Sequence, residues 1–298
     1  MRVRVAVPAS VANLGPGFDI LAMALQLQNE VRAEQRPGAL SIDAGSDAPM
    51  ELNDPERNLV TTAYVQSCAA LGVPATGVHF NCVNRIPIGR GMGSSAAATL
   101  SGVLVATALH QAPWDENEVL ERVAVLEGHR DNAAAALLGG LAICAPGAPA
   151  VQMAVSDDLR AVLFIPDLPF TTTESRRVVP ASFSRDDAIF NAGRCALLVR
   201  ALAVGDHGAL RVAMEDRWHQ DARFALMKGP REIIAAADGA GASGAALAGA
   251  GPSVIALTAR DPAPIVAAMA AAAASVGVAG GTMVLPPRNY GTRVDVSP

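Results

Sequence analysis

The stretch that decides the fold is Pro87-Ile88-Gly89-Arg90-Gly91-Met92-Gly93-Ser94-Ser95-Ala96-Ala97. Its three alternate glycines permit positive φ angles, so successive backbone N–H groups can converge on one anion. A strand pattern precedes this stretch at residues 79–83, and a helical pattern follows it at 94–110. At the start of that helix, free amides and the helix dipole favour negative charge by roughly 0.3–1 kcal/mol. We therefore predict a strand, a phosphate-binding loop (residues 87–97, the phosphate loop) and a helix, in that order.

Two common kinds of phosphate-binding loop are excluded by the residues that follow the glycines. No Lys-Ser or Lys-Thr follows Gly93, so the stretch is not a Walker loop. Ser94 stands where a dinucleotide-binding fingerprint needs its third glycine. Either Ser94 or Ser95 could bind phosphate or a magnesium ion through its hydroxyl. The alternative is a tight strand-to-helix turn that binds nothing.

Composition and charge limit the possible partners. Hydrophobic residues make up 51% of the 298 and charged residues 17%, which suits a folded core and argues against disorder. A net charge of -5 without a run of basic residues argues against nucleic acid as a partner. Residues 239–259 and 262–287 are uncharged and long enough to cross a bilayer, but they are rich in Ala and Gly and broken by prolines. We expect buried helix and strand there, and no membrane contact.

The cysteines and the first residues point to the cytoplasm. The four cysteines are scattered, without a CxxC pair or a histidine cluster, and we interpret them as reduced thiols in the core. Residues 1–7 alternate arginine and valine, which is typical of a strand and unlike the apolar core of a signal peptide. We therefore expect a cytoplasmic protein.

Helix and strand patterns alternate along the whole chain. Strands are predicted at 2–8, 21–32, 79–83, 161–165 and 254–259, and helices at 58–71, 94–110, 115–127, 185–204 and 265–274. The best candidate for a linker is Ala145-Pro146-Gly147-Ala148-Pro149, because prolines and glycine suit neither a helix nor a central strand. We expect an α+β protein with two domains, residues 1–152 and 153–298.

Two further strings combine polar side chains that suit a small charged substrate. The first is Pro8-Ala9-Ser10-Val11-Ala12-Asn13-Leu14-Gly15-Pro16-Gly17-Phe18-Asp19. Its Asn13 amide and Asp19 carboxylate suit a hydroxyl and an ammonium group, although both side chains could instead close the turn by local hydrogen bonds. The second string is Glu127-Gly128-His129-Arg130-Asp131-Asn132. Asp131 could contact substrate, or it could be the N-cap of a helix.

Three more strings complete the set of candidate site residues. Thr172-Thr173-Glu174-Ser175-Arg176 and His219-Gln220-Asp221-Ala222-Arg223 each carry an arginine, whose planar guanidinium can bind a carboxylate through two parallel hydrogen bonds. Arg177 is an alternative to Arg176, and both assignments compete with an ordinary surface charge. Leu247-Ala248-Gly249-Ala250-Gly251-Pro252-Ser253 could pack its backbone beside the phosphate loop, or be a turn into the next strand.

Taken together and in this order, the strings resemble the GHMP kinases, the superfamily of galactose, homoserine, mevalonate and phosphomevalonate kinases. Within it they are most similar to the homoserine kinases. The chain departs from the family pattern at Met92 for a leucine, Arg130 for a proline and Ala248 for a serine. The mevalonate and diphosphocytidyl-methylerythritol kinases rely on a lysine near the N-terminus, whereas Lys228 is the one lysine of this chain.

The resemblance implies a fold, an activity and a site. It implies an N-terminal ATP-binding domain with a ribosomal-protein-like β-α-β unit, a ferredoxin-like C-terminal domain, and a cytoplasmic homodimer that makes O-phospho-L-homoserine for threonine biosynthesis. ATP would be held by Pro87, Ile88, Gly89, Arg90, Gly91, Met92, Gly93, Ser94, Ser95, Ala96, Ala97, Gly249 and Gly251, and Mg²⁺ by Ser94 or Ser95 and Glu121. Homoserine would contact Asn13, Asp19, His129, Asp131, Asn132, Thr172, Arg176 and Arg223.

Of these substrate residues, Asn13, Asp19, Asp131, Arg176 and Arg223 would take part in catalysis. Two other functions remain open on the residues alone. One is a kinase for another small alcohol, and the other is a non-catalytic sensor that binds nucleotide on the same fold.

Overall fold

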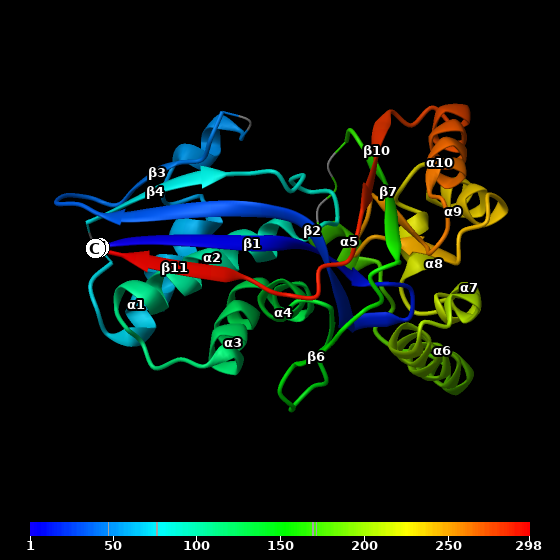
Figure 1. Ribbon diagram of the computed structural model, residues 1–298, viewed down its shortest axis with the longest axis horizontal. Coiled ribbons are helices and arrows are strands. Elements are labelled where there is room, and N and C mark those ends of the chain that lie inside the picture. The colour runs from blue at the N-terminus through cyan, green and yellow to red at the C-terminus, as the bar shows by residue number, and fades with distance from the viewer. Residues whose placement is uncertain (47, 76, 169, 171) are drawn as a thin grey trace.

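Two β-sheets, each covered by helices, make up the molecule (Figure 1). The computed structural model describes residues 1–298 except 47, 76, 169 and 171. For Thr172 it describes the backbone but not the side chain. Within these residues the mixed α+β fold class is confirmed. The described helices include none that is long and apolar enough to cross a membrane.

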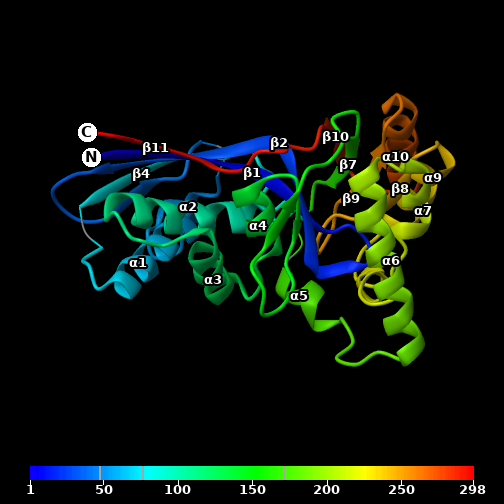
Figure 2. The same cartoon turned by 60° about the horizontal axis from the view of Figure 1, so that its bottom comes forward.

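The first sheet has seven strands, with β11-β1-β2-β4-β3 in spatial order and β5 and β6 attached to β2. These strands are β1 (Arg2–Asn13), β2 (Gly17–Gln35), β3 (Ser41–Asp43), β4 (Val78–Val83), β5 (Leu141–Ile143), β6 (Val151–Met153) and β11 (Arg293–Ser297). One face is covered by α1 (Leu59–Leu71), α2 (Ser94–Leu109), α3 (Glu116–Glu127) and α4 (Asp131–Leu138), as Figure 2 shows. A short 3₁₀ helix, η1 (Met50–Asn53), precedes α1.

The second sheet has the strand order β10-β7-β9-β8, from β7 (Arg160–Pro166), β8 (Gly244–Leu247), β9 (Val254–Thr258) and β10 (Gly280–Leu285). All its neighbouring strands are antiparallel, and this is the order of a ferredoxin-like sheet. Its helices are α5 (Thr172–Arg177), α6 (Arg185–Val204), η2 (His207–Ala209), α7 (Leu210–Ala213), α8 (Gln220–Phe224), α9 (Pro230–Gly239) and α10 (Ala263–Ser275). As an edge strand, β10 is mostly exposed, so the expectation of a buried strand there was wrong.

Local residues explain where the helices around the phosphate loop begin and end. Helix α3 begins with a capping box, in which Asp115 and Glu118 each accept a hydrogen bond from the other's backbone N–H at 2.9 Å. It ends at Gly128, which has a φ of 82°. Helix α2 begins directly after Gly93, so the phosphate loop leads straight into its free N-terminal amides.

The chain returns to the first sheet at its end. Strand β11 pairs antiparallel with β1, with Val294 opposite Val5 and Val296 opposite Val3. The predicted linker at 145–149 lies between β5 and β6, which form an antiparallel hairpin within the first sheet. A domain boundary at residue 152 stays a prediction, and residues 293–297 belong spatially with the N-terminal half.

Candidate functional site

The phosphate loop has the backbone that its glycines predicted. Gly89, Gly91 and Gly93 have φ angles of 67°, 72° and 73°. A Cβ on Gly91 would lie 2.1 Å from the Ala248 carbonyl oxygen, and a Cβ on Gly93 would lie 2.3 Å from the Ser10 hydroxyl. Side chains are therefore excluded at both positions by neighbouring segments as well as by the backbone conformation. The structure brings the loop against the first and last of the candidate strings.

The other residues of the phosphate loop divide between surface and core. Ile88 is exposed. Arg90 donates from Nη1 to the Ile88 carbonyl at 3.2 Å and from Nη2 to the Asp167 carbonyl. Met92, Ala96 and Ala97 are buried in the main hydrophobic core, while Pro87 lies at the loop's start. The side chains of 92, 96 and 97 thus hold the loop in place, and its backbone is left to meet a ligand.

A carboxylate that the sequence reasoning missed lies beside the first turn of α2. Ser95 Oγ donates to Glu127 at 2.6 and 2.8 Å, and Thr99 Oγ1 donates to the same carboxylate at 2.5 Å. Glu121 instead pairs with Arg130, and its side chain is 63% exposed. The structure therefore brings Glu127, and not Glu121, to the loop serines. The sequence contained a signal for Glu127, because this residue directly precedes Gly128, the glycine that ends α3.

Asn13 braces the turn between β1 and β2. It has a φ of 70° and is 4% exposed. Its Nδ2 donates to the Gly249 carbonyl at 2.9 Å, and its Oδ1 accepts from the Asp19 backbone N–H at 3.2 Å. The bond with Asp19 is a local hydrogen bond within the turn, whereas the bond to Gly249 joins the turn to a distant segment. The same bonds present the Asp19 side chain.

Asp19 and Arg176 form a bidentate ion pair between the two halves of the chain. Arg176 donates from Nη1 and Nη2 to the two carboxylate oxygens of Asp19 at 2.7 and 2.8 Å. This contact raises the pKa of Arg176 above its usual value. Arg177 is exposed on the same short helix, α5. The pairing therefore distinguishes Arg176 from its rival as the arginine that reaches Asp19.

Arg223 is buried behind this pair, at 2% exposure. It donates from Nη1 to His219 Nδ1 at 2.9 Å and to the Gly249 carbonyl at 3.1 Å. Burial, reinforced by the charge of Arg176, lowers the pKa of Arg223 to about 10. Phe18 was not among the predicted site residues, although it lies in the string at residues 8–19. Its ring centre is 5.5 Å from the Arg176 guanidinium and 5.2 Å from that of Arg223.

His219 is buried in a neutral form. Its Nδ1 accepts from Arg223, so its Nε2–H donates to the Gly15 carbonyl at 2.8 Å. Burial lowers the pKa of His219 to about 4. This histidine therefore links the first turn of the chain to α8.

Asp131 and its neighbours lie next to the phosphate loop. Asp131 is 1% exposed and accepts from His129 Nδ1 at 2.8 Å, which raises the pKa of His129. Asp131 is not the helix N-cap, because Arg130 occupies that position. Asn132 Oδ1 accepts from Ser10 Oγ at 3.0 Å and lies 3.2 Å from where a Gly93 Cβ would be. Asp131 and Asn132 are thus the first two residues of α4, the helix that faces the phosphate loop.

Residues 247–253 pack beside the phosphate loop, as their glycines predicted. Gly249 N–H donates to the Ala12 carbonyl at 3.2 Å, and Ser175 Oγ donates to the Ala250 carbonyl at 2.8 Å. A Cβ on Gly249 would lie 3.3 Å from the Gly91 carbonyl, while one on Gly251 would meet Met227 at 2.6 Å. Gly249 and Gly251 both lie next to the phosphate loop, since a Cβ on Gly91 would also lie 2.9 Å from the Gly251 carbonyl oxygen. Thr172 was predicted to contact homoserine, but its side chain is not among those that the structure describes.

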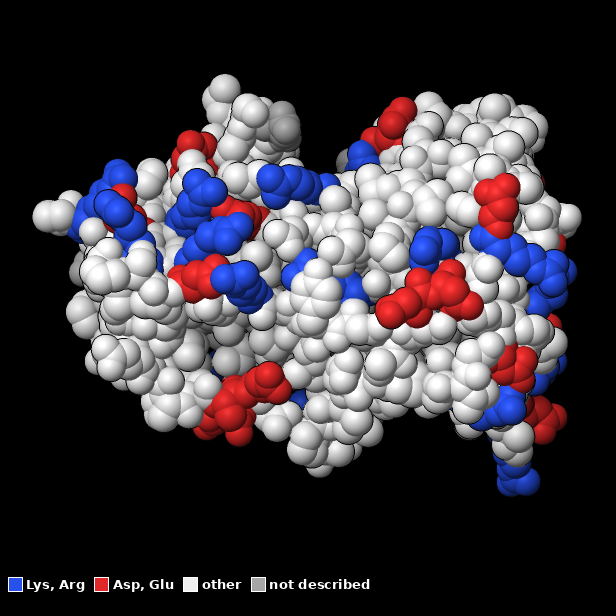
Figure 3. Space-filling model, viewed as in Figure 1, with Lys and Arg blue, Asp and Glu red and all other residues white. Residues whose placement is uncertain are grey.

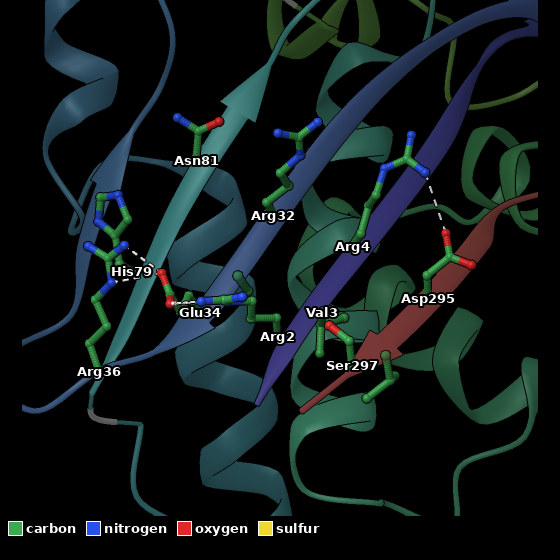
Figure 4. A pocket seen from close by; sticks show the side chains of 12 residues that line it. Arg2, Val3, Arg4, Arg32, Glu34, Arg36, His79, Asn81, Asp295 and Ser297 are labelled. Carbon is green, nitrogen blue, oxygen red and sulfur yellow. Dashed lines mark hydrogen bonds and ion pairs between the residues drawn. The ribbon is translucent and has the colours of Figure 1, made fainter.

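One cavity lies outside this cluster of residues. About 630 Å³ of space lies on the open face of the first sheet, above β1, β2, β4 and β11 (Figure 4). Basic side chains gather over this face (Figure 3), but Arg2 and Arg36 both pair with Glu34, and Arg4 pairs with Asp295. We place no nucleotide there, since these cations are neutralised by their neighbours and the phosphate loop is elsewhere.

Two family models match the chain. Residues 58–140 match the GHMP kinases N terminal domain, and residues 198–276 match the GHMP kinases C terminal domain. The first match contains the phosphate loop, Glu127 and Asp131, and the second contains His219, Arg223 and Gly249. The fold and the site thus define a GHMP kinase, a class of ATP-dependent enzymes.

Curated relatives narrow the class. The chain is 41% identical to the homoserine kinase of Synechococcus sp. over 268 residues, which covers 88% of this chain and 87% of the relative. It is 39% identical to the homoserine kinase of Streptomyces coelicolor over 274 residues, 90% and 88% of the two chains. A crystal structure of homoserine kinase from Cytophaga hutchinsonii has a TM-score of 0.86 at 27% identity, covering 99% of this chain and 97% of that one. The chain belongs to the homoserine kinase family.

Proposed function

We propose that this protein transfers the γ-phosphate of ATP to the side-chain hydroxyl of L-homoserine, giving O-phospho-L-homoserine and ADP. The observation that carries the proposal is the contact of Gly93 with Ser10 and Asn132. This contact would bring a phosphate group on the loop beside the strings suited to an amino-acid alcohol. The family relationship supports the choice of homoserine and a step in threonine biosynthesis.

For the nucleotide, the proposal uses the backbone of the phosphate loop and the N-terminal amides of α2. The oxygen donors Ser95, Thr99 and Glu127 fit Mg²⁺, which prefers hard oxygen ligands and commonly takes one or two carboxylates together with substrate phosphates. Among the described residues there is no cluster of three or more His, Cys, Asp or Glu for a metal, and such a site needs none. When bound, Mg²⁺ would neutralise charge on the phosphates. Of the ligands that the sequence predicts, Ser94 or Ser95 and Glu121, the proposal keeps Ser95 and takes Glu127 in place of Glu121.

For the amino acid, the proposal uses the Asp19–Arg176 pair. Its carboxylate would suit an ammonium group, and its guanidinium fork would suit an α-carboxylate. Arg223 adds positive charge from behind, although its contacts with Gly249 and His219 also give it a structural role. Phosphoryl transfer has a loose transition state, so positioning and charge neutralisation can supply most of the catalysis. Asp131, held by His129, is proposed to orient the attacking hydroxyl.

The test is a comparison of acceptors. ADP release would be measured with homoserine, mevalonate and galactose side by side, and the product of the active reaction identified by phosphorus NMR. We expect turnover with homoserine and a phosphomonoester on its side-chain oxygen. Turnover with another alcohol instead, or ATP binding without turnover of any of them, would contradict the proposal. We also propose that the enzyme acts in the cytoplasm as a homodimer.

A further inference from the structure

Arg130 connects three segments of the chain around the start of α4. Its side chain is 14% exposed, and the two ends of its guanidinium reach different segments. Nη1 donates to the Glu121 carboxylate on α3. Nη2 donates to the Ala145 carbonyl at 3.1 Å and to the Ala148 carbonyl at 2.6 Å, both in the exposed loop between β5 and β6. We call this set of contacts the Arg130 clip.

The backbone at Arg130 is not the one that a proline would impose. Arg130 is the N-cap residue of α4, with a φ of -126° and a ψ of -3°. Proline stands at this position in the family pattern, and a proline ring holds φ near about -65°. The turn into α4 therefore lacks the restraint of a proline ring in this chain. The side chain of Arg130 restrains the turn through the clip instead.

The residue after Arg130 belongs to the proposed substrate site. Asp131 is 1% exposed and accepts a hydrogen bond from His129 at 2.8 Å. The pKa of Arg176 is raised mainly by its bond with Asp19, and the negative charge of Asp131 also raises it. Asp131 therefore faces the ion pair that is proposed to bind the amino acid. A shift of the turn at Arg130 would move the Asp131 carboxylate relative to that pair.

The loop held by the clip is itself bonded beside Asp19. Cys144, at the start of this loop, donates its backbone N–H to the Ile20 carbonyl at 2.7 Å. Ala145, whose carbonyl the clip holds, is the next residue. One end of the clip is thus adjacent to Asp131 in the chain, and the other end is adjacent to a backbone bond beside Asp19. The clip closes a short path between two carboxylates that are far apart in the sequence.

We propose that Arg130 is a positioning residue, which holds Asp131 in register with Asp19 by clipping the start of α4 to the loop between β5 and β6. The inference rests on the proposed function for the identity of the substrate. Arg130 acts through Asp131 and does not itself contact homoserine. The ion pair with the exposed Glu121 contributes little, so the two carbonyl bonds are the essential part of the clip.

Steady-state kinetics of Arg130→Ala tests the clip. We expect kcat with homoserine to fall about 10–100-fold, because a displacement of about 1 Å near reacting groups can cost that much. The KM for ATP should stay within about twofold of the wild type, since the phosphate loop is not part of the clip. Arg122→Ala is the matched control and should behave like the wild type. Arg122 is exposed on α3, with its guanidinium 5.0 Å from the Trp114 ring centre.

Arg130→Lys separates the shape of the side chain from its charge. It keeps the positive charge, but an ammonium group does not reproduce the planar fork of a guanidinium. We therefore expect its kcat to lie closer to that of the alanine variant than to that of the wild type. A lysine variant with the kcat of the wild type would show that charge alone is sufficient, which would overturn the proposal.

A double-mutant cycle with Asp131→Asn separates positioning from a general loss of stability. If Arg130 acts through Asp131, then Arg130→Ala should change the residual rate of the Asp131→Asn variant by less than about threefold. Effects of the two substitutions that multiply would mean that Arg130 acts independently of Asp131, which would overturn the proposal.

Hydrogen exchange supplies a readout that does not depend on activity or on homoserine. The amides of Ala134 and Cys144 donate to the carbonyls of Arg130 and Ile20, each at 2.7 Å. Arg130→Ala should speed exchange at both amides at least about tenfold and leave the amides of β9 unchanged. Unchanged exchange at both amides would overturn the proposal, as would an alanine variant with the kcat of the wild type. Failure of the wild type to phosphorylate homoserine would instead contradict the proposed function, and the exchange measurement would still test the clip.

Discussion

Asp19 and Arg176 illustrate how much of the site depends on single side chains. They are 157 residues apart and come from different halves of the chain, yet they form the bidentate pair at its centre. Phe18 lies against both guanidinium groups, which limits where Arg176 and Arg223 can move. The sequence named three of these four residues and missed the aromatic ring, because a single phenylalanine in a turn is usually a packing residue.

Replacing Arg176 tests its proposed contact with the substrate carboxylate. Arg176→Ala should remove a charge-assisted interaction of about 1.5–3 kcal/mol and raise the homoserine KM roughly 10–150-fold. The KM for ATP should not change, since the phosphate loop is untouched. Initial-rate kinetics with each substrate varied in turn would measure both. Arg177→Ala is the matched control, and equal effects of the two variants would exclude the assignment.

Glu121 and Glu127, both on α3, give a second matched pair. Glu127→Gln keeps the size of the side chain but removes the charge beside Ser95. We expect the Mg²⁺ concentration for half-maximal rate to rise at least roughly 10–100-fold. Glu121→Gln should behave like the wild type, because its carboxylate pairs with Arg130. Rates as a function of free Mg²⁺ at saturating ATP and homoserine would decide between the two glutamates. A larger effect of Glu121→Gln than of Glu127→Gln would identify Glu121 as the metal ligand.

At the scale of elements, the strand, loop and helix around residues 79–109 work as one unit. The loop's backbone is shaped by its own glycines, while Ser10 of β1 and Ala248 after β8 press against it. A side chain at Gly91 or Gly93 would therefore collide with a different element. The loop's conformation and the glycine-rich neighbour at residues 247–253 could therefore be predicted from sequence, but the approach of Ser10 could not.

Gly93→Ala separates this collision from ordinary backbone strain. The new Cβ would lie 2.3 Å from Ser10 Oγ, so the loop must shift. We expect the dissociation constant of a non-hydrolysable ATP analogue, measured by calorimetry, to rise at least about tenfold. Gly72→Ala is the control, because Gly72 has a φ of 69° at the end of α1 and open space where a Cβ would be. It should cost about 1–2 kcal/mol of stability and leave nucleotide binding unchanged. Normal binding by the Gly93 variant would place the phosphates elsewhere.

At the scale of the whole molecule, the two sheets share one core. The main hydrophobic cluster runs from Val5 and Val7 in the first sheet to Leu163 and Ile255 in the second. A smaller cluster lies between the second sheet and helices α9 and α10. Strand β11 adds a second link, because the chain leaves β10 and ends beside β1. We therefore expect the two halves to unfold together.

Buried His219 makes that stability depend on pH. Its pKa is about 4 in the folded protein and 6.5 when free, so the unfolded state takes up a proton first as the pH falls. The stabilisation is complete above about pH 6.5 and is lost progressively towards pH 4. Urea unfolding between pH 5 and 6.5, a window above most carboxylate titration, should show stability rising with pH.

His219→Gln should flatten this slope. The pKa of His129 is raised, so its contribution is present below its free value and is lost only as the pH rises above it. His129→Gln should therefore leave the slope between pH 5 and 6.5 unchanged, which makes it the control. An unaltered slope in the His219 variant would mean that another group titrates there.

The sequence by itself determined the local structure and the kind of chemistry. The glycines of the phosphate loop, the capping box at Asp115 and the glycine ends of α1 and α3 act through neighbours in the chain, so their conformations can be predicted from a short window. The polar strings, read together, also indicated the substrate class and the family.

Only the tertiary structure decided which side chains meet. Glu121 and Glu127 are six residues apart on α3 and point in directions about 120° apart, so the packing of α3 against α2 selects the one that faces Ser95. The return of β11 to β1 and the pairing of Asp19 with Arg176 also join distant segments. Such contacts depend on how whole elements bury their apolar faces, which no short stretch of sequence specifies.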